Sequence, residues 1–183
     1  MSWYSNLLER SPILTKVVTS GLIAATGDVN CQYIVHMNSN QRRQQDGTPE
    51  EWFSLDSART GRFGLLGALL VAPCIHVWYG LLGAYIPGST FVATLARTAV
   101  DQLVFAPAFI PLFVGSLMTL EGKGLKDVEV QLRETYVDTL MMNWGIWVPA
   151  QMINFRFMPL KFQVLFSNVI GLVWNTYLSF KTR

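Results

Sequence analysis

The chain has 183 residues, of which 51% are apolar and only 14% are Asp, Glu, Lys or Arg. Soluble domains contain about 25% charged residues, so a water-soluble globule of this size would lack the charges that cover a protein surface. The 14 basic and 12 acidic residues leave a formal net charge of +2, which excludes a strongly basic nucleic-acid-binding domain. We therefore expect a small membrane protein whose partner is the lipid bilayer and which binds no nucleic acid.

Charge-free stretches divide the chain into segments of membrane length. They cover residues 63–96, 102–120, 139–155 and 162–180, which are 34, 19, 17 and 19 residues long. A hydrocarbon core of about 30 Å needs about 20 helical residues. The longest stretch is too long for one span and is interrupted by Pro87-Gly88-Ser89-Thr90, so we expect two antiparallel helices joined there by a tight turn.

These segments predict an all-α fold, a polytopic membrane helix bundle that forms a single domain over residues 1–183. Ser11-Pro12 is typical of a helix start, with serine as the N-cap and proline at the first helical position. Four firm transmembrane helices are expected, over 12–36, 56–84, 89–120 and a fourth that reaches residue 155. A solvated polar loop is expected at 37–56, and a short charged amphipathic segment from Leu125 leads into the fourth span. The last apolar helix, 161–180, is expected to span the membrane, re-enter it or lie on its surface.

Polar side chains inside the expected spans are candidate functional residues, because a charged group in a span costs about 2.5–3.5 kcal/mol on insertion scales. Arg97 and Asp101 are spaced i, i+4, so the pair can neutralise itself on one helix face. Asn143, Gln151 and Asn154 share one face of the fourth helix with Trp147. The candidates for a pore lining or a polar network are Asp28, Gln32, Arg59, Arg62, Arg97, Asp101, Gln102, Asn143, Gln151 and Asn154.

Each of these groups also has a structural interpretation. Arg59 and Arg62 lie near a helix end, where long side chains reach the headgroups. The amides of the fourth helix are equally suited to hydrogen bonding between helices. Asp28 and Asp101 have short side chains that cannot reach the membrane surface in this way, so a functional role is better supported for them.

Small residues and prolines predict how the helices pack. Gly64, Ala68 and Ala72 recur at four-residue intervals, which lets two backbones approach closely, either within the bundle or between protomers. Prolines occur inside the expected spans at positions 73, 107, 111 and 149. We expect kinked helices there, with neighbouring polar side chains bonding the freed carbonyls.

Motifs for catalysis and metal binding are absent from the sequence. There is no glycine-rich phosphate loop, no His-Glu-x-x-His and no serine elbow, and the two cysteines and two histidines are not clustered. We expect no enzyme activity, no cofactor and no metal.

Several pieces of the sequence, in order along the chain, resemble one known family. They are Trp3-Tyr4, Gly27-Asp28, Asp56, Arg59-Thr60, Arg62-Phe63, Pro73, His76, Trp78-Tyr79, Asp101-Gln102, Pro107, Asn143-Trp144, Trp147, Gln151, Asn154-Phe155, Pro159-Leu160, Trp174-Asn175 and Tyr177-Leu178-Ser179. The family is that of Mpv-seventeen and the peroxisomal membrane protein of 22 kDa, small four-span proteins. This resemblance implies the mitochondrial inner membrane or, as the alternative, the peroxisomal membrane. The opening Trp3-Tyr4 is more similar to the mitochondrial branch.

Two functions follow from the residues and the resemblance. The first is a poorly selective channel for small solutes or ions that contributes to organelle homeostasis, because channel activity has been proposed for family members and the helices carry polar faces. The second is a non-conducting structural or accessory subunit of a membrane complex, in which the polar stripes stabilise the bundle and the Gly64/Ala68/Ala72 seam docks a partner. A homo-oligomer is compatible with either function.

Overall fold

The computed structural model describes the backbone of residues 3–181 and the side chains of residues 3–174. Every regular element in this part of the chain is a helix, which confirms the all-α prediction. In chain order they are α1 (Trp3–Arg10), α2 (Pro12–Gln45), α3 (Ser57–Leu66), η1 (Gly67–Val71), α4 (Ala72–Tyr85), α5 (Phe91–Val100), η2 (Asp101–Phe105), α6 (Ala106–Leu120), α7 (Leu125–Phe157) and α8 (Leu160–Lys181). The two η elements are π-helical turns that continue the helices on either side of them.

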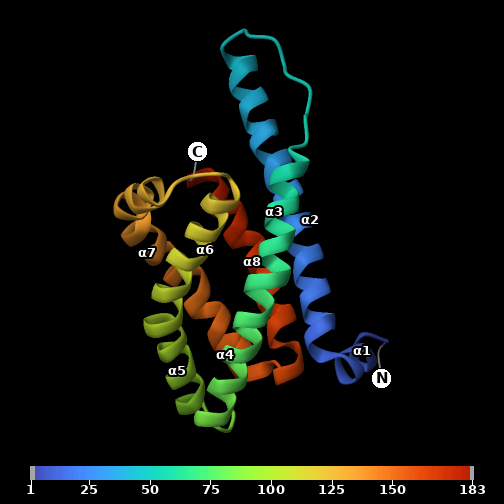
Figure 1. Ribbon diagram of the computed structural model, residues 1–183, viewed down its shortest axis with the longest axis vertical. Helices are drawn as coiled ribbons and strands as arrows, with labels where there is room; N and C mark the ends of the chain where they lie inside the picture. The colour runs from blue at the N-terminus through green and yellow to red at the C-terminus, as the bar shows by residue number, and fades with distance from the viewer. Residues whose placement is uncertain (1–2, 182–183) are drawn as a thin grey trace.

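The long helices form antiparallel rods that lie side by side (Figure 1). Ser57–Tyr85 and Phe91–Leu120 are continuous helices of 29 and 30 residues, and both are long and apolar enough to cross a membrane. The turn between Tyr85 and Phe91 confirms the predicted break at Pro87-Gly88-Ser89-Thr90. The last helix, α8, packs against α2, α4 and α7, so it is part of the bundle. Its apolar portion Leu160–Trp174 is shorter than the two helices that are long enough to cross a membrane.

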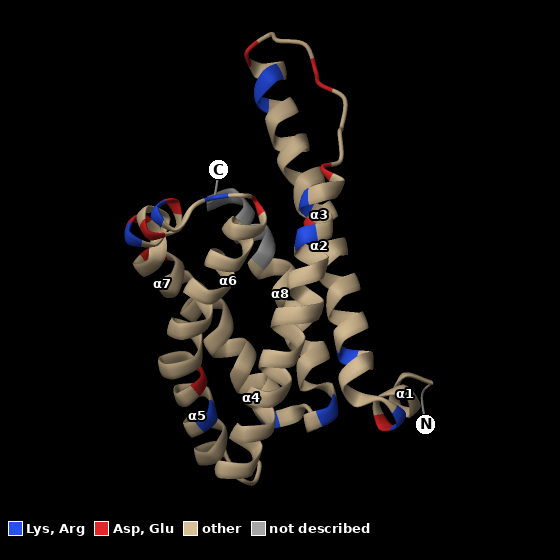
Figure 2. Cartoon of the chain, in the orientation of Figure 1, with Lys and Arg blue, Asp and Glu red and all other residues tan. Residues whose placement is uncertain are grey.

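Many polar residues lie inside the bundle, beside a small apolar core, and many large apolar residues lie on its outside. The buried residues of α2 are Lys16, Ser20, Gly27, Asp28, Cys31 and Gln32. On the outer face of the same helix, Leu14 is 63% exposed and Leu22 is 65% exposed. Figure 2 shows the charged residues gathered mostly at the two ends of the rods, with few along the middle. This is the reverse of a soluble protein, and it is the pattern expected where lipid replaces water around the bundle.

The predicted polar loop at 37–56 is wrong in its first half, because α2 continues to Gln45. Residues 37–45 are hydrophilic but include no glycine or proline, so polarity alone does not end the helix. The turn comes at Gly47, whose φ of 68° is left-handed. The Asn40 amide then holds the returning chain, since Nδ2 donates to the Glu51 carbonyl at 2.9 Å and Oδ1 accepts from the Glu51 amide at 3.1 Å.

Two further boundaries differ from the expectation. The amphipathic segment from Leu125 and the fourth span form a single helix, α7, of 33 residues. The short helix α1, Trp3–Arg10, precedes Ser11 and was not predicted. Its apolar residues Trp3, Tyr4, Leu7 and Leu8 do recur at helical spacing, which is a signal that could have found it.

The prolines at 73 and 107 each follow a π-helical turn. Gly67–Val71 precedes Pro73, and Asp101–Phe105 precedes Pro107, each at the same offset. A proline ring clashes with the carbonyl four residues earlier and has no N–H to donate. The wider π turn gives that carbonyl room, and such turns are frequent at functional sites. Asp101 and Gln102 therefore lie in a π-helical turn, the kind of backbone that is frequent at functional sites.

Side chains of α7 bond carbonyls that these prolines leave free. Because Pro107 has no N–H, the Gln102 carbonyl lacks its i+5 donor, and it accepts from Trp144 Nε1 at 2.9 Å. Pro111 likewise leaves the Pro107 carbonyl free, and the Tyr136 hydroxyl donates to it at 3.0 Å. The prediction that polar neighbours satisfy these carbonyls is confirmed at both prolines.

Candidate functional site

Five of the predicted polar residues meet in the centre of the bundle. Asp101, Gln102, Asn143, Gln151 and Asn154, here called the central cluster, are each at most 5% exposed. Their side chains form one chain of hydrogen bonds. Asn143 Nδ2 donates to Gln102 Oε1 at 3.0 Å, and Gln102 Nε2 donates to Asp101 Oδ2 at 2.7 Å. Gln151 Nε2 donates to the same Asp101 oxygen at 2.8 Å, and Asn154 Nδ2 donates to Gln151 Oε1 at 2.9 Å. Helix α7 and the turn η2 supply all five residues.

Helices α4 and α8 add three residues that the sequence prediction did not include. Trp78 Nε1 donates to Asp101 Oδ1 at 2.7 Å. The Tyr79 hydroxyl lies 2.7 Å from Ser167 Oγ and accepts from Gln151 Nε2 at 2.9 Å. Trp78 and Tyr79 had been noted only as part of the family resemblance. Ser167 lies in the last helix, which was expected from the sequence only as an apolar helix of undetermined depth, although Ser167 and Asn168 are polar residues within it.

Asp101 has no cationic partner among the described residues. Its two carboxylate oxygens accept from three donors, on Trp78, Gln102 and Gln151. An ionised carboxylate only accepts hydrogen bonds, so it matches this set of donors. The site therefore holds a buried carboxyl group that forms no ion pair with an ammonium or guanidinium group among the described residues.

The expected pairing of Arg97 with Asp101 does not occur. Arg97 Nε and Nη2 both donate to the Ile86 carbonyl, at 2.8 and 2.6 Å. That carbonyl lies at the end of α4, where the helix leaves its last acceptors unsatisfied. Arg97 therefore stabilises the turn between the two longest apolar helices and leaves Asp101 to the amide and indole donors.

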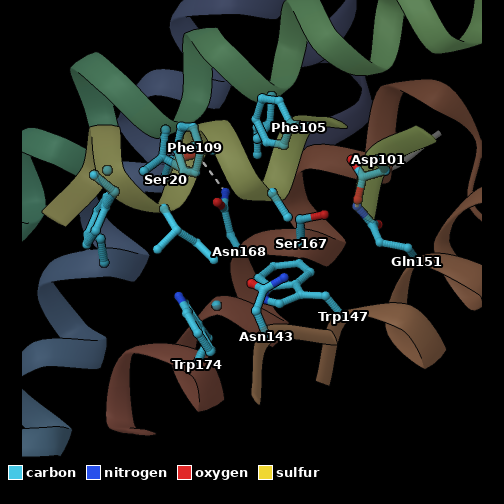
Figure 3. Close-up of a pocket in the computed structure, with 18 of the residues that line it drawn as sticks. Ser20, Asp101, Phe105, Phe109, Asn143, Trp147, Gln151, Ser167, Asn168 and Trp174 are labelled. Atoms are coloured by element: carbon cyan, nitrogen blue, oxygen red, sulfur yellow. Dashed lines mark hydrogen bonds between the residues drawn. The ribbon is translucent and has the colours of Figure 1, made fainter. Parts of the chain in front are cut away.

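A cavity of about 120 Å³ lies beside the central cluster (Figure 3). Its polar wall includes Asp101, Gln102, Asn143 and Gln151, together with Ser167 and Asn168 of α8. The aromatic wall is made by Phe105, Phe109 and Phe113, three residues one turn apart whose rings contact in series. Asn168 Nδ2 donates to Ser20 Oγ of α2 at 2.6 Å. Helices on both sides of the bundle thus contribute polar groups, and the space is large enough for several water molecules.

A second group of predicted residues lies near one end of the bundle. Asp28 is 1% exposed, and its Oδ1 is 2.8 Å from Arg59 Nε. Its Oδ2 accepts from Gln32 Nε2 and from the Thr60 hydroxyl, each at 2.7 Å. Gln32 Oε1 also accepts from the Asp56 amide at 2.8 Å. This outer cluster (Asp28, Gln32, Arg59, Thr60, Asp56) binds the start of α3 to the middle of α2, so its geometry is that of a structural clamp.

Arg62 and the small residues of the second rod have other surroundings. The Nε of Arg62 is buried and has no hydrogen-bond partner among the described residues. Gly64 and Ala68 face α2, where a Cβ added at Gly64 would lie 3.4 Å from the Gly21 carbonyl oxygen and one added at Gly21 would lie 3.1 Å from the Ala68 Cβ. Ala72 is 1% exposed. The small residues therefore serve packing between helices of the same chain.

The structure shows no group of three or more histidine, cysteine or acidic residues placed to hold a metal ion in the described part of the chain. His76 instead lies 2.8 Å from the buried Lys16 ammonium, which donates to its Nδ1. Asn175 and Tyr177-Leu178-Ser179, which carry the end of the family resemblance, lie outside the residues whose side chains are described.

Comparison with known proteins identifies the family. A model of the Mpv17 / PMP22 family matches residues 118–179, which include the whole of α7 and most of α8. Protein sym-1 of Neurospora crassa is 39% identical over 98% of this chain and 96% of its own length. The chain belongs to the Mpv17 / PMP22 family. No solved structure matches it.

Other members of the Mpv17 / PMP22 family match the chain over nearly its whole length. Peroxisomal membrane protein 2 of Bos taurus is 33% identical over 98% of this chain and 87% of its own. Mitochondrial inner membrane protein Mpv17 of Danio rerio is 30% identical over 98% of this chain and 95% of its own. The names of these relatives confirm the expected location at this level, which is the mitochondrial inner membrane with the peroxisomal membrane as the alternative.

Proposed function

We propose that the chain forms a poorly selective channel for small solutes or ions in the mitochondrial inner membrane. The observation that carries the proposal is the cavity inside the bundle with the Asp101 carboxylate in its wall. A buried carboxylate without a cationic partner is costly in a membrane, and such groups usually face a water-filled space. The charge of Asp101 would make the path more favourable for cations than for anions of the same size.

Most of the lining surface of the cavity is apolar, and a group of polar side chains on one part of it supports a hydrated path. Polar groups reach it from α2, from η2, from α7 and from α8, as with Ser20, Asp101, Asn143 and Asn168. These groups can replace part of the hydration shell of a passing solute. The aromatic wall formed by Phe105, Phe109 and Phe113 supplies no hydrogen bonds, so a solute would be held weakly and released readily.

The proposal includes four transmembrane helices: α2, the rod α3–η1–α4, the rod α5–η2–α6, and α7, with α8 packed among them. Support for α2 comes from its exposed apolar face and buried polar face. Support for α7 comes from residues 139–155, which carry no charge and place Asn143 and Gln151 inward. With α8 filling the groove beside α2, the polar interior is screened from lipid on that side.

The alternative, a non-conducting accessory subunit, stays a prediction. Its proposed docking seam, Gly64, Ala68 and Ala72, is buried or packed against α2 within the same chain. A partner would therefore have to bind a different surface. The central cluster would then act only as hydrogen-bonded glue between helices.

Conduction through purified protein in planar lipid bilayers tests the proposal. We expect single-channel currents in wild-type protein and a changed ion preference in Asp101→Asn, which keeps the shape of the side chain. Asp46→Asn is the matched control, since Asp46 lies exposed at the end of α2, away from the cavity. The absence of conductance at every voltage and pH would contradict a channel function.

A further inference from the structure

A second, open pocket lies at the end of the bundle that is opposite the 46–56 loop. It has a volume of about 580 Å³ and lies between the turn after α4 and the turn between α7 and α8. Its lining includes two arginines, Arg97 and Arg156, and no acidic residue. Gly80, Gly83 and Ala84 form a floor without bulky side chains. We call this the basic pocket.

Both arginines have hydrogen-bond donors to spare. Arg97 uses Nε and Nη2 on the Ile86 carbonyl, and its Nη1 has no hydrogen-bond partner among the described residues. Arg156 uses Nη1 on the Ser89 carbonyl, which leaves Nε and Nη2. Neither arginine forms an ion pair within the described chain, whereas Lys161 nearby is 3.2 Å from the Glu9 carboxylate. The hydrogen bonds to the 86–90 turn thus use only some of the N–H groups of each arginine.

The position of the basic pocket indicates what could reach it. The turn at residues 86–90 joins two helices that are long and apolar enough to span the bilayer, and in the four-helix topology proposed above it lies at a membrane surface. Aromatic residues around it face outward, with Tyr85 80% exposed, Phe91 64% exposed and Phe157 70% exposed. Aromatic side chains concentrate at the headgroup level of membranes. The helix α8 begins at Leu160, in the pocket wall, which adds the positive end of its dipole.

We propose that the basic pocket binds a phosphate group, with the headgroup of an anionic phospholipid as its source. Arginine presents planar N–H pairs that fit phosphate oxygens, and two of them in an acid-free pocket supply the charge that a phosphodiester needs. Basic pockets between membrane helices bind such headgroups. The glycine floor gives the headgroup room, and the exposed aromatic residues contact its glycerol and the upper part of its acyl chains. The site does not depend on whether the bundle conducts.

Lipid binding can be measured on the intact purified protein in detergent. The probes are a phosphatidylglycerol, a phosphatidylcholine of the same acyl chains and inorganic phosphate, each titrated while the thermal midpoint and the bound lipid in native mass spectra are followed. We expect phosphatidylglycerol to bind and raise the midpoint, and phosphatidylcholine to do so much less. Arg156→Gln should weaken phosphatidylglycerol binding about tenfold, the usual loss for a charge-assisted hydrogen bond. Arg133→Gln is the matched control, because it removes the same charge from the exposed start of α7.

A second variant blocks the pocket without changing its charge. A Cβ added at Gly80 would meet nothing within 4 Å, and Gly80 lines the pocket, so we expect the side chain of Gly80→Leu to be accommodated and to occupy part of the pocket. It should weaken phosphatidylglycerol binding as Arg156→Gln does, whereas Gly61→Leu, also in open space, should not. If inorganic phosphate alone binds with the same dependence on Arg156 and Gly80, the site is still a phosphate site but its ligand comes from solution. Equal binding by Arg156→Gln, Gly80→Leu and their controls would overturn the proposal.

Discussion

Two buried aspartates of this chain have opposite surroundings. Asp28 is paired with Arg59 at 2.8 Å and holds α2 against the start of α3. Asp101 accepts only from the neutral donors of Trp78, Gln102 and Gln151, beside a cavity. A buried ion pair that joins two helices has a structural role, because removing one partner is costly, whereas a carboxyl group that contacts only neutral donors beside a cavity is available to a solute. The structure therefore gives Asp28 and Asp101 different roles, which could not be distinguished from the sequence alone.

Asp28 and Arg59 should be strongly coupled in folding. Replacing either residue alone by alanine breaks a largely buried ion pair, so each single variant should lose about 3 kcal/mol of unfolding free energy. The double variant should lose much less than the sum of the two. A double-mutant cycle on reversible unfolding in mixed micelles measures this coupling. Additive losses would show that the ion pair does not stabilise the bundle.

Part of the site can be predicted from spacing and part cannot. The face shared by Asn143, Gln151 and Asn154 follows from the helical repeat, and the structure buries all three. Their partners cannot be predicted in this way, because Gln151 contacts Asp101 across 50 positions of sequence. The Arg97–Asp101 prediction failed for the same reason. Local spacing permits that pair, but the free carbonyl at Ile86 and the indole of Trp78 compete for the two side chains.

At the scale of elements, the fold depends on close contact between α2 and the turn η1. A Cβ added at Gly67 would lie 2.6 Å from the Ala24 Cβ and 2.8 Å from the Ser20 carbonyl oxygen. The second contact is with backbone, which cannot rotate away. Glycine at 67 thus permits the approach that also brings Ser20 to the cavity.

Gly67→Ala should destabilise the protein by about 1–3 kcal/mol, the usual cost of overpacking. Gly61→Ala is the control, because a Cβ at Gly61 meets nothing within 4 Å and alanine favours the helix. Thermal unfolding of the two variants in detergent should show a lower midpoint for Gly67→Ala only. Equal midpoints would mean that the α2–η1 contact is looser than the structure shows.

The helix boundaries show where sequence signals act. Helix α2 was expected to end near residue 36, where the chain becomes polar, but it continues until Gly47 allows a left-handed turn. The turns η1 and η2 could not be placed from sequence, although the prolines at 73 and 107 predicted a disturbance nearby. A proline indicates that the helix must adjust, but packing determines whether it kinks, widens or ends.

The whole molecule is a bundle of helical rods that alternate in direction, with many polar side chains buried inside it and many apolar side chains exposed outside it. The 46–56 loop and the 121–124 turn lie at one end, and the 86–90 turn lies at the other (Figure 1). Apolar residues cover the outside of each rod, as with Leu22, Leu69, Leu103 and Met141. If the rods cross the membrane, these two ends lie on opposite sides of it.

Labelling of single cysteines tests this topology. After Cys31 and Cys74 are replaced by alanine, cysteine is introduced at Ser54, Ser89 or Lys123, all of which are exposed. A membrane-impermeant maleimide should reach Ser54→Cys and Lys123→Cys from one side of sealed vesicles and Ser89→Cys from the other. If all three positions were labelled from one side, the rods would not span the membrane as proposed.

The reversal potential in a KCl gradient across a planar bilayer measures whether ions pass the Asp101 carboxylate. The account predicts that wild-type channels prefer K⁺ over Cl⁻. It also predicts that Asp101→Asn shifts the reversal potential toward zero, while Asp46→Asn leaves it unchanged. Identical reversal potentials in wild type and Asp101→Asn would contradict a conducting path along the central cluster.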